Sequence, residues 1–137
     1  MITNFKKIAK FRIKKKEQIY YKNHNKFSVA FKGIYTVFAE ESSFRYQTLI
    51  FALVLVMGIA LDLNQVEWIS IIIVSIIVLS LEIMNTAVEN IIDIISPEYN
   101  KSAGKVKDIA AGCVLLASIG AVCIGIFIFY PKIITLI

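Results

Sequence analysis

The chain contains little cysteine, histidine and proline. Its two cysteines, Cys113 and Cys123, lie inside a long apolar run, and the single histidine, His24, is distant from both in the sequence. Thiols surrounded by aliphatic residues behave as small apolar side chains, and a zinc site needs more ligands than these three residues supply. Neither a disulfide framework nor a zinc centre is therefore expected.

Several motifs are also absent. The sequence contains no Walker phosphate-binding pattern and no kinase glycine-rich loop, so any nucleotide site must be of another kind. Beyond its lysine-rich beginning it has no low-complexity tract and no internal repeat, and no nucleic-acid partner is expected. A basic, interrupted stretch of about 45 residues precedes the first long apolar run, which is unlike a signal peptide.

What the sequence does contain is a large excess of apolar residues. The 137-residue chain is 58% hydrophobic with a mean hydropathy of +0.72, whereas ordinary soluble domains are roughly 45–50% apolar. Residues 46–61 and 109–131 are uncharged runs of sixteen and 23 residues, and a membrane-spanning helix needs about 20. The sequence predicts an all-α membrane protein with one domain, 1–137. The expected transmembrane helices are 44–61, 66–96 and 103–131.

The N-terminal forty residues have a different pattern. From Phe27 to Phe38, apolar residues recur at the i, i+3, i+4 and i+7 spacing of an amphipathic helix, so a helix lying at the membrane interface is expected over 26–40. Residues 2–22 are rich in lysine with interleaved apolar residues. They fit either a second interfacial helix on an anionic surface or a disordered basic tail.

The basic residues predict the orientation in the membrane. Fourteen of the fifteen Lys and Arg residues, all except Lys132, lie in the N-terminal segment that ends at Arg45 or in the 97–108 loop, and the 62–65 turn contains none. Basic residues favour the cytoplasmic side of a membrane. A plasma-membrane protein with a cytoplasmic N-terminus and a cytoplasmic 97–108 loop is therefore expected.

The second span carries a stripe of polar side chains. Glu82, Asn85, Glu89 and Asp93 are spaced i, i+3, i+7 and i+11, which places them within about 60° of one another on a helix. Ionisable groups inside a membrane helix are costly and are functional candidates by default. The alternatives are a helix end that faces water, pairing with Lys or Arg, and a proton or ion pathway.

The chemistry of this stripe suggests a nucleotide. Crowded carboxylates favour a hard divalent cation, and Mg²⁺ commonly takes one or two carboxylates together with substrate phosphates. Glu41 lies at the same membrane level just before the first span, while Lys105, Lys107 and Asp108 belong to the 97–108 loop. Carboxylates, a metal ion and lysines at one membrane surface indicate phosphoryl transfer.

Three segments carry a resemblance to a known family. They are Glu82-Ile-Met-Asn-Thr-Ala-Val-Glu-Asn-Ile-Ile-Asp93, Ser96-Pro-Glu-Tyr-Asn100 and Ala103-Gly-Lys-Val-Lys-Asp-Ile-Ala-Ala-Gly112. With Phe31-Lys-Gly33 and Glu41-Ser-Ser-Phe-Arg45, they resemble the small bacterial membrane lipid kinases, which comprise prokaryotic diacylglycerol kinase and undecaprenol kinase. The resemblance implies a homotrimer that transfers the γ-phosphate of ATP to a membrane lipid alcohol.

The resemblance also implies roles for individual residues. Glu82 matches the general base, Glu41 and Glu89 match ligands of Mg²⁺, and Asn85 and Asp93 line the site beside Glu82. The residues expected to contact ATP are Lys22, Glu41, Glu89, Glu98, Tyr99, Asn100, Lys107 and Asp108.

The lipid alcohol and the function class leave alternatives. Heavy use of Ile, Lys and Asn resembles low-GC Gram-positive proteins and favours undecaprenol as substrate, with diacylglycerol as the alternative. A proton- or cation-conducting membrane oligomer and a membrane scaffold are non-enzymatic alternatives. The 98–100 loop and the Lys107-Asp108 pair weigh against both, because neither function needs a nucleotide loop.

Overall fold

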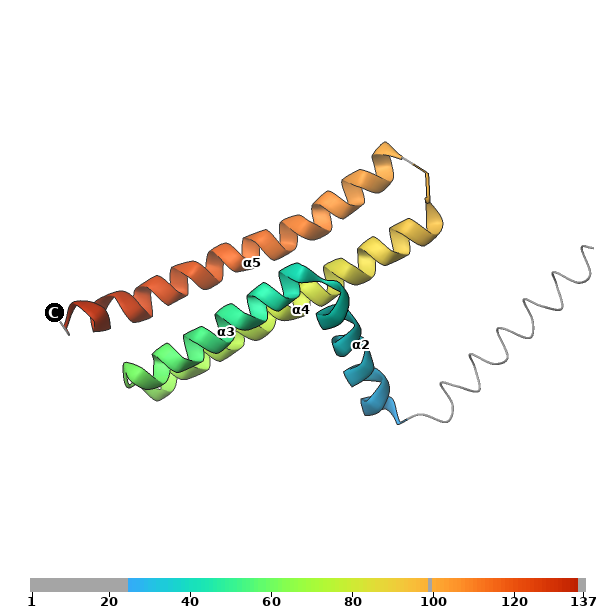
Figure 1. The fold of residues 1–137 in the computed structure, drawn as a ribbon. Helices are drawn as coiled ribbons and strands as arrows, with labels where there is room; N and C mark the ends of the chain where they lie inside the picture. Colours follow the sequence, from blue (N-terminus) through green and yellow to red (C-terminus); the bar gives the residue numbers. More distant parts are fainter. Residues whose placement is uncertain (1–24, 99, 136–137) are drawn as a thin grey trace, which may run out of the picture. The chain divides into compact units, whose positions relative to one another are not determined.

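A computed structural model describes residues 25–98 and 100–135. This part of the chain consists of four α-helices and contains no strand, as expected from the sequence (Figure 1). The helices are α2 (Lys26–Glu40), α3 (Ser42–Ala60), α4 (Gln65–Ile95) and α5 (Lys101–Ile134). The expected helix or basic tail at 2–22, with Lys22, lies outside the described residues, as does Tyr99.

Helix α2 coincides with the amphipathic segment expected at 26–40. The side chain of Asn25 accepts a hydrogen bond from the backbone N–H of Phe27 at 3.3 Å, which satisfies one of the free donors at the helix start. Among the described residues, those from Asn25 to Thr36 belong to one compact unit and those from Val37 onward to another. The helix is confirmed, and its position on a membrane surface stays a prediction.

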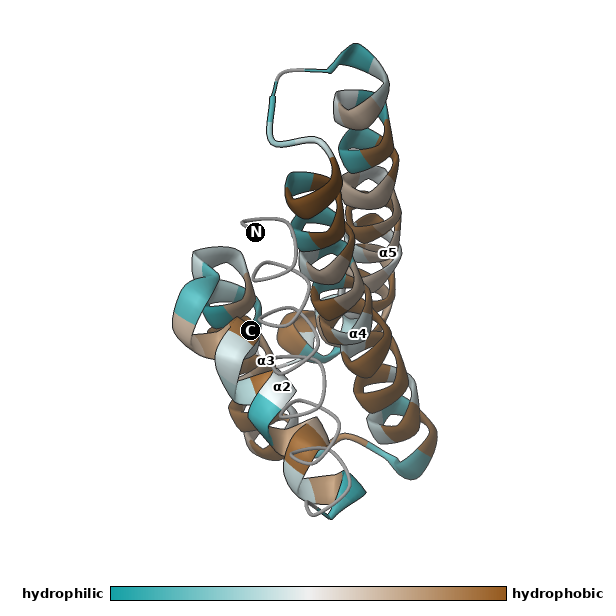
Figure 2. Ribbon diagram, turned by 90° about the vertical axis from the view of Figure 1, so that its right-hand side faces the viewer, coloured by the Kyte–Doolittle hydropathy of each residue, from teal (hydrophilic) through white to brown (hydrophobic). Residues whose placement is uncertain are grey.

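Helices α3, α4 and α5 are each long and apolar enough to cross a membrane. Hydrophobic residues cover most of the length of α4 and α5 (Figure 2). Large apolar side chains are exposed in the isolated chain, Ile59 by 74% and Phe127 by 80%. Water would penalise that surface by about 25 cal/mol per Å², so lipid or further protein has to cover it.

Helix α5 is longer than the expected 103–131. It begins at Lys101 and continues through Pro131 to Ile134. Proline removes one backbone hydrogen bond from a helix, but transmembrane helices tolerate it where other groups satisfy the freed carbonyl. The carbonyl that Pro131 leaves without its helical donor is that of Phe127. Helix α5 goes on for less than one turn, and the N–H of Thr135 bonds to the Pro131 carbonyl at 3.2 Å.

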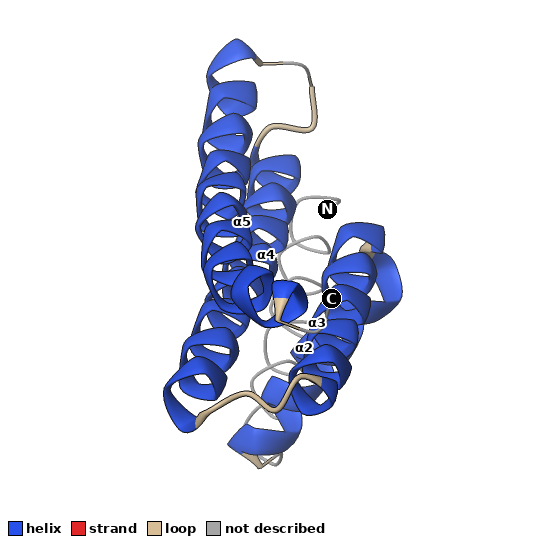
Figure 3. Cartoon of the chain, turned by 90° about the vertical axis from the view of Figure 1, so that its left-hand side faces the viewer, coloured by secondary structure: helices blue, strands red, loops and turns tan. Residues whose placement is uncertain are grey.

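Two connections join the three long helices (Figure 3). A short turn over 61–64 links α3 to α4, and residues 96–100, of which 99 is not described, link α4 to α5. We call these the turn end and the connection end of the bundle. Helix α5 packs extensively along α4, whereas α3 makes fewer contacts with α4.

Side chains of the turn itself stabilise the turn end. Asp62 adopts a left-handed backbone with φ 48°, which Asp tolerates better than most residues. Asn64 then caps α4: its side chain accepts from the N–H groups of Val66 at 2.9 Å and Glu67 at 3.0 Å. The Glu67 carboxylate accepts in return from the N–H of Asn64 at 2.7 Å, which completes a capping box.

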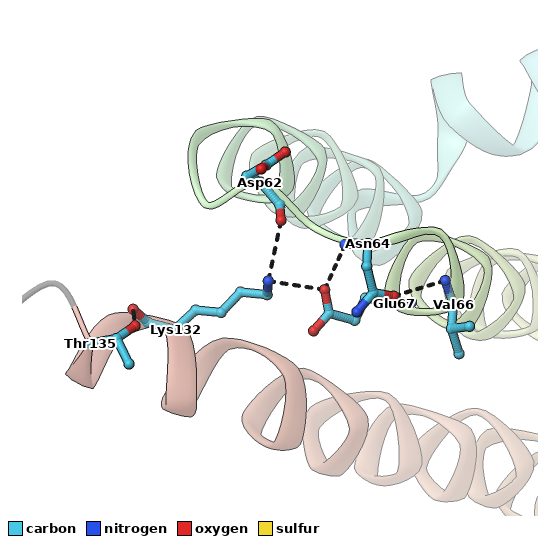
Figure 4. Close-up of polar contacts among 6 residues, drawn as sticks. All are labelled: Asp62, Asn64, Val66, Glu67, Lys132 and Thr135. Atoms are coloured by element: carbon cyan, nitrogen blue, oxygen red, sulfur yellow. Dashed lines mark hydrogen bonds and ion pairs between the residues drawn. The ribbon is translucent and has the colours of Figure 1, made fainter.

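A lysine from α5 joins this turn (Figure 4). The ammonium group of Lys132 lies 3.1 Å from the Glu67 carboxylate and donates to the carbonyl of Asp62 at 3.2 Å. Beside it, Leu63, Ile71 and Phe129 form a small buried cluster. Three helices therefore meet at the turn end through one ion pair and one apolar cluster.

Gly58 lets α3 approach α4 closely. A Cβ atom at this position would lie 2.7 Å from a ring carbon of Trp68, a separation that real side chains do not adopt. By contrast, a Cβ atom at Gly120 in α5 would have nothing within 4 Å. The absence of a side chain at Gly58 therefore sets the distance between the two helices.

We expect Gly58→Ala to lower the free energy of unfolding in detergent by about 1–3 kcal/mol, the usual cost of overpacking. In a Trp68→Leu background the same change should cost less than about 0.5 kcal/mol, because the ring is gone and Ala favours helix by about 1 kcal/mol over Gly. Gly120→Ala is the matched control and should not destabilise. Equal losses with and without the Trp68→Leu substitution would contradict this account of the contact.

Candidate active site

The polar stripe lies on one face of α4. The helix is continuous from Gln65 to Ile95, so Glu82, Asn85, Glu89 and Asp93 follow one another along it as the spacing predicted. Their exposure rises along the chain: Glu82 is only 6% exposed, Asn85 and Glu89 are half-buried, and Asp93 is exposed. The stripe runs from the interior of the bundle to the connection end.

Glu82 is held by two side chains from α3. The hydroxyl group of Ser43 donates to Oε1 of Glu82 in a short hydrogen bond, and the amide of Gln47 donates to Oε2 at 3.0 Å. The hydroxyl of Thr86 donates to the backbone carbonyl of Glu82 at 3.1 Å. Both oxygens of this buried carboxylate are therefore hydrogen-bonded.

Sequence reasoning did not identify Ser43 and Gln47 as partners of Glu82. The available signal was their spacing of four residues at the start of a long apolar run, which places them on the same face of α3. That spacing does not say which part of α4 the face contacts. Only the packing of the two helices provides that information.

Asn85 and Glu89 form the middle of the stripe. The amide nitrogen of Asn85 donates to the Glu89 carboxylate at 3.0 Å. A carboxylate only accepts hydrogen bonds. The amide of Asn85 therefore turns its nitrogen toward Glu89, and the amide of Gln47 turns its nitrogen toward Glu82. The carbonyl oxygens of Asn85 and Gln47 are consequently buried, and neither has a hydrogen-bond partner among the described residues.

At the connection end, Asp93 pairs with Lys107 of α5. The ammonium nitrogen lies 2.5 Å from the carboxylate. Asp93 is exposed and Lys107 is half-buried, and such a pair contributes at most about 1 kcal/mol to stability. Asp108, the next residue, is exposed. The structure thus brings together two of the expected site residues from different helices.

Glu41 occupies the break between α2 and α3. It is the residue before the first turn of α3, it is half-buried, and its side chain forms no capping hydrogen bond. The guanidinium of Arg45, one turn further on, donates to the carbonyls of Phe38 at 3.2 Å and Ala39 at 2.9 Å. Arg45 therefore satisfies backbone carbonyls at the end of α2.

The loop expected to contact ATP also begins α5. The side chain of Asn100 accepts hydrogen bonds from the N–H groups of Ser102 at 2.8 Å and Ala103 at 3.4 Å, so it is the N-cap of the helix. Glu98 is exposed, and its carbonyl accepts from the Ser96 hydroxyl at 3.3 Å. A capping role for Asn100 was not anticipated from the sequence.

The acidic side chains of the described residues do not by themselves cluster into a metal site. No group of three or more His, Cys, Asp or Glu side chains comes together within that part of one chain. Glu41 and Glu89 offer the hard oxygen ligands that Mg²⁺ prefers, and one or two carboxylates suffice where phosphate oxygens complete the shell. The donor chemistry fits a magnesium–nucleotide complex better than a metal bound by protein alone.

A cavity of about 280 Å³ lies among α3, α4 and α5. Gln47 lines it together with mainly apolar side chains, which include Phe51, Val78 and Phe129. Since Gln47 also bonds to Glu82, the cavity adjoins the buried end of the polar stripe. An apolar molecule in this space would contact Gln47, which donates a hydrogen bond to the Glu82 carboxylate.

Comparison with known proteins matches residues 28–129 to the family described as prokaryotic diacylglycerol kinase. The chain is 33% identical over 101 residues to an undecaprenol kinase of Bacillus subtilis. The matched region covers 74% of this chain and 82% of that protein. It is 31% identical over 93 residues to a diacylglycerol kinase of Escherichia coli, and this matched region covers 68% of this chain and 76% of that protein. A diacylglycerol kinase of Synechocystis is 33% identical over 111 residues, which cover 80% of this chain and 63% of that protein.

The cap at Asn100 can be separated from other roles of this residue. We expect Asn100→Ala to lower the stability of the purified protein by about 1 kcal/mol, whereas Asn100→Asp, which also caps, should stay within about 0.3 kcal/mol of the original. Thermal unfolding in detergent measures both, with Ser102→Ala as the control because only its backbone N–H contacts the cap. Equal destabilisation by Ala and Asp would rule out the capping account.

Proposed function

Because this chain belongs to the prokaryotic diacylglycerol kinase family and is a lipid kinase, we propose that it phosphorylates undecaprenol with ATP and that Glu82 is the general base. The observation that carries the proposal is the burial of the Glu82 carboxylate at the inner end of the α4 stripe, beside an apolar cavity. A lipid hydroxyl and a proton acceptor can meet there without bulk water. Membership in a kinase family decides against the conducting oligomer and the scaffold.

The proposed reaction moves one proton and one phosphoryl group. The lipid hydroxyl oxygen forms a bond to the γ-phosphorus of ATP while the bond from that phosphorus to the ADP oxygen breaks, and the hydroxyl proton goes to the Glu82 carboxylate. Such transition states need little covalent help from the protein. Positioning and charge stabilisation supply most of the rate.

We propose that ATP binds at the connection end of the stripe. Glu89 and Glu41 are the proposed carboxylate ligands of Mg²⁺, which when bound neutralises phosphate charge. Lys107, held near the site by Asp93, is proposed to contact phosphate. The further proposed nucleotide contacts are Lys22, Glu98, Tyr99, Asn100 and Asp108. Asn85 and Asp93 line the path between the nucleotide and Glu82.

Two observations bear on the lipid. The Bacillus subtilis undecaprenol kinase matches over 82% of its length. The chain's heavy use of Ile, Lys and Asn also resembles that of low-GC Gram-positive proteins. Diacylglycerol is the second candidate, because the relatives from Escherichia coli and Synechocystis are diacylglycerol kinases at similar identity.

We further propose that the enzyme lies in the plasma membrane with its connection end and N-terminus in the cytoplasm. The distribution of Lys and Arg supports this orientation, and cytoplasmic ATP would then reach the exposed end of the stripe. A homotrimer is proposed as the working form. Extensive exposed apolar surface on α3 and α5 supports the packing of copies against one another.

The purified protein should transfer radiolabel from γ-labelled ATP to undecaprenol in lipid vesicles. Parallel vesicles with diacylglycerol should give at least about tenfold less labelled product, which corresponds to about 1.4 kcal/mol of discrimination. Lipid extraction and chromatography distinguish the two products. More label on diacylglycerol than on undecaprenol would make diacylglycerol the substrate. No label on either lipid would refute the proposed reaction.

A second prediction concerns the nucleotide. We expect Lys107→Met to raise the KM for ATP on the order of 10–100-fold, the usual loss for a hydrogen bond to a charged group. Lys105→Met is the matched control: it removes the same charge from an exposed position nearby and should change the KM by less than about twofold. Equal effects of the two variants would mean that only the net charge of the loop matters.

A further inference from the structure

We propose that Ser43 and Gln47 of α3 are positioning residues that hold the Glu82 carboxylate in its reactive orientation. The proposal rests on the proposed role of Glu82 as general base. It goes beyond that role, because it places part of the catalytic machinery on the first membrane span. Neither residue is expected to contact the reacting phosphorus.

The geometry restricts the carboxylate from both sides. Ser43 donates to Oε1 and Gln47 donates to Oε2 at 3.0 Å, and the two donors lie one helical turn apart. A glutamate side chain alone rotates about several bonds, and two donors on opposite oxygens limit that rotation. An ionised carboxylate offers about four acceptor positions, so two remain for a lipid hydroxyl.

The chemistry of the donors matters as much as their number. Both are uncharged, whereas Lys or Arg in their place would form an ion pair with Glu82. An ion pair would compete for the negative charge that has to attract the lipid proton. A hydroxyl and an amide therefore orient the carboxylate and still leave its charge for the reaction.

Gln47 also contacts the space proposed for the lipid. Its side chain lines the apolar cavity and donates to Glu82 at the same time. Its carbonyl oxygen is buried, with no partner among the described residues. A buried acceptor without a partner costs free energy. The hydrogen bond that the Gln47 amide donates to Glu82 explains why an amide stands here despite that cost.

The test compares Ser43→Ala, Gln47→Met and the double variant in the vesicle assay. Each single change should lower kcat on the order of 10–100-fold, the effect of a small misplacement of a reacting group. The KM for ATP should stay within about twofold, because ATP is proposed to bind at the other end of the stripe. The double variant should fall further, toward the level of Glu82→Gln. Ser43→Thr keeps the hydroxyl and should retain most of kcat.

Thr48→Val is the matched control. Thr48 neighbours Gln47, but its hydroxyl donates to the carbonyl of Phe44 in its own helix at 2.8 Å. Its loss should change kcat by less than about twofold. A fall as large as that of Gln47→Met would mean that any polar loss in α3 lowers activity, and this would overturn the proposal.

An infrared measurement tests the contact without turnover. The carboxylate stretching band of Glu82 is the band that Glu82→Gln removes, and it should shift in Ser43→Ala and in Gln47→Met. An unchanged band, or a double variant with at least half of the original kcat, would overturn the positioning role. An original enzyme that labels no lipid, or a fully active Glu82→Gln, would instead refute the proposed function.

Discussion

The hydrogen-bonded burial of the Glu82 carboxylate constrains the rest of this structure. Lipid offers such a group neither water nor counter-charge, so neighbouring protein groups have to satisfy it. Ser43 and Gln47 do so from α3, which requires the start of α3 to lie against the middle of α4. A long apolar helix could otherwise pack on its neighbour in several registers, because lipid tails compete equally for its surface.

The contacts at the turn end maintain the same arrangement from the opposite side. Gly58 brings α3 onto the ring of Trp68, while Lys132 joins α5 to the turn through Glu67 and the Asp62 carbonyl. Between the two ends lies a mainly apolar cavity. The exposure of the stripe then rises toward the connection end, so one helix carries both a buried carboxylate and an exposed one.

The sequence was sufficient to predict the parts that depend on periodicity and length. Uncharged runs identified the three long helices, and the i, i+3, i+7 spacing placed Glu82, Asn85 and Glu89 on one face. The partners of Glu82 could not be predicted in the same way, because helix–helix register depends on how residues such as Gly58 and Trp68 fit together. The capping role of Asn100 follows from local backbone geometry, which its place in a motif did not reveal.

We propose that Glu82 takes the proton of the lipid hydroxyl and does not serve to bind ATP. The most direct measurement compares Glu82→Gln with the original enzyme in vesicles, for both phosphoryl transfer and equilibrium ATP binding. The account predicts that transfer falls by at least about 100-fold, as for loss of a general base, with ATP affinity within about twofold and the same oligomer size. Transfer near the original rate, or a parallel loss of ATP binding, would contradict it.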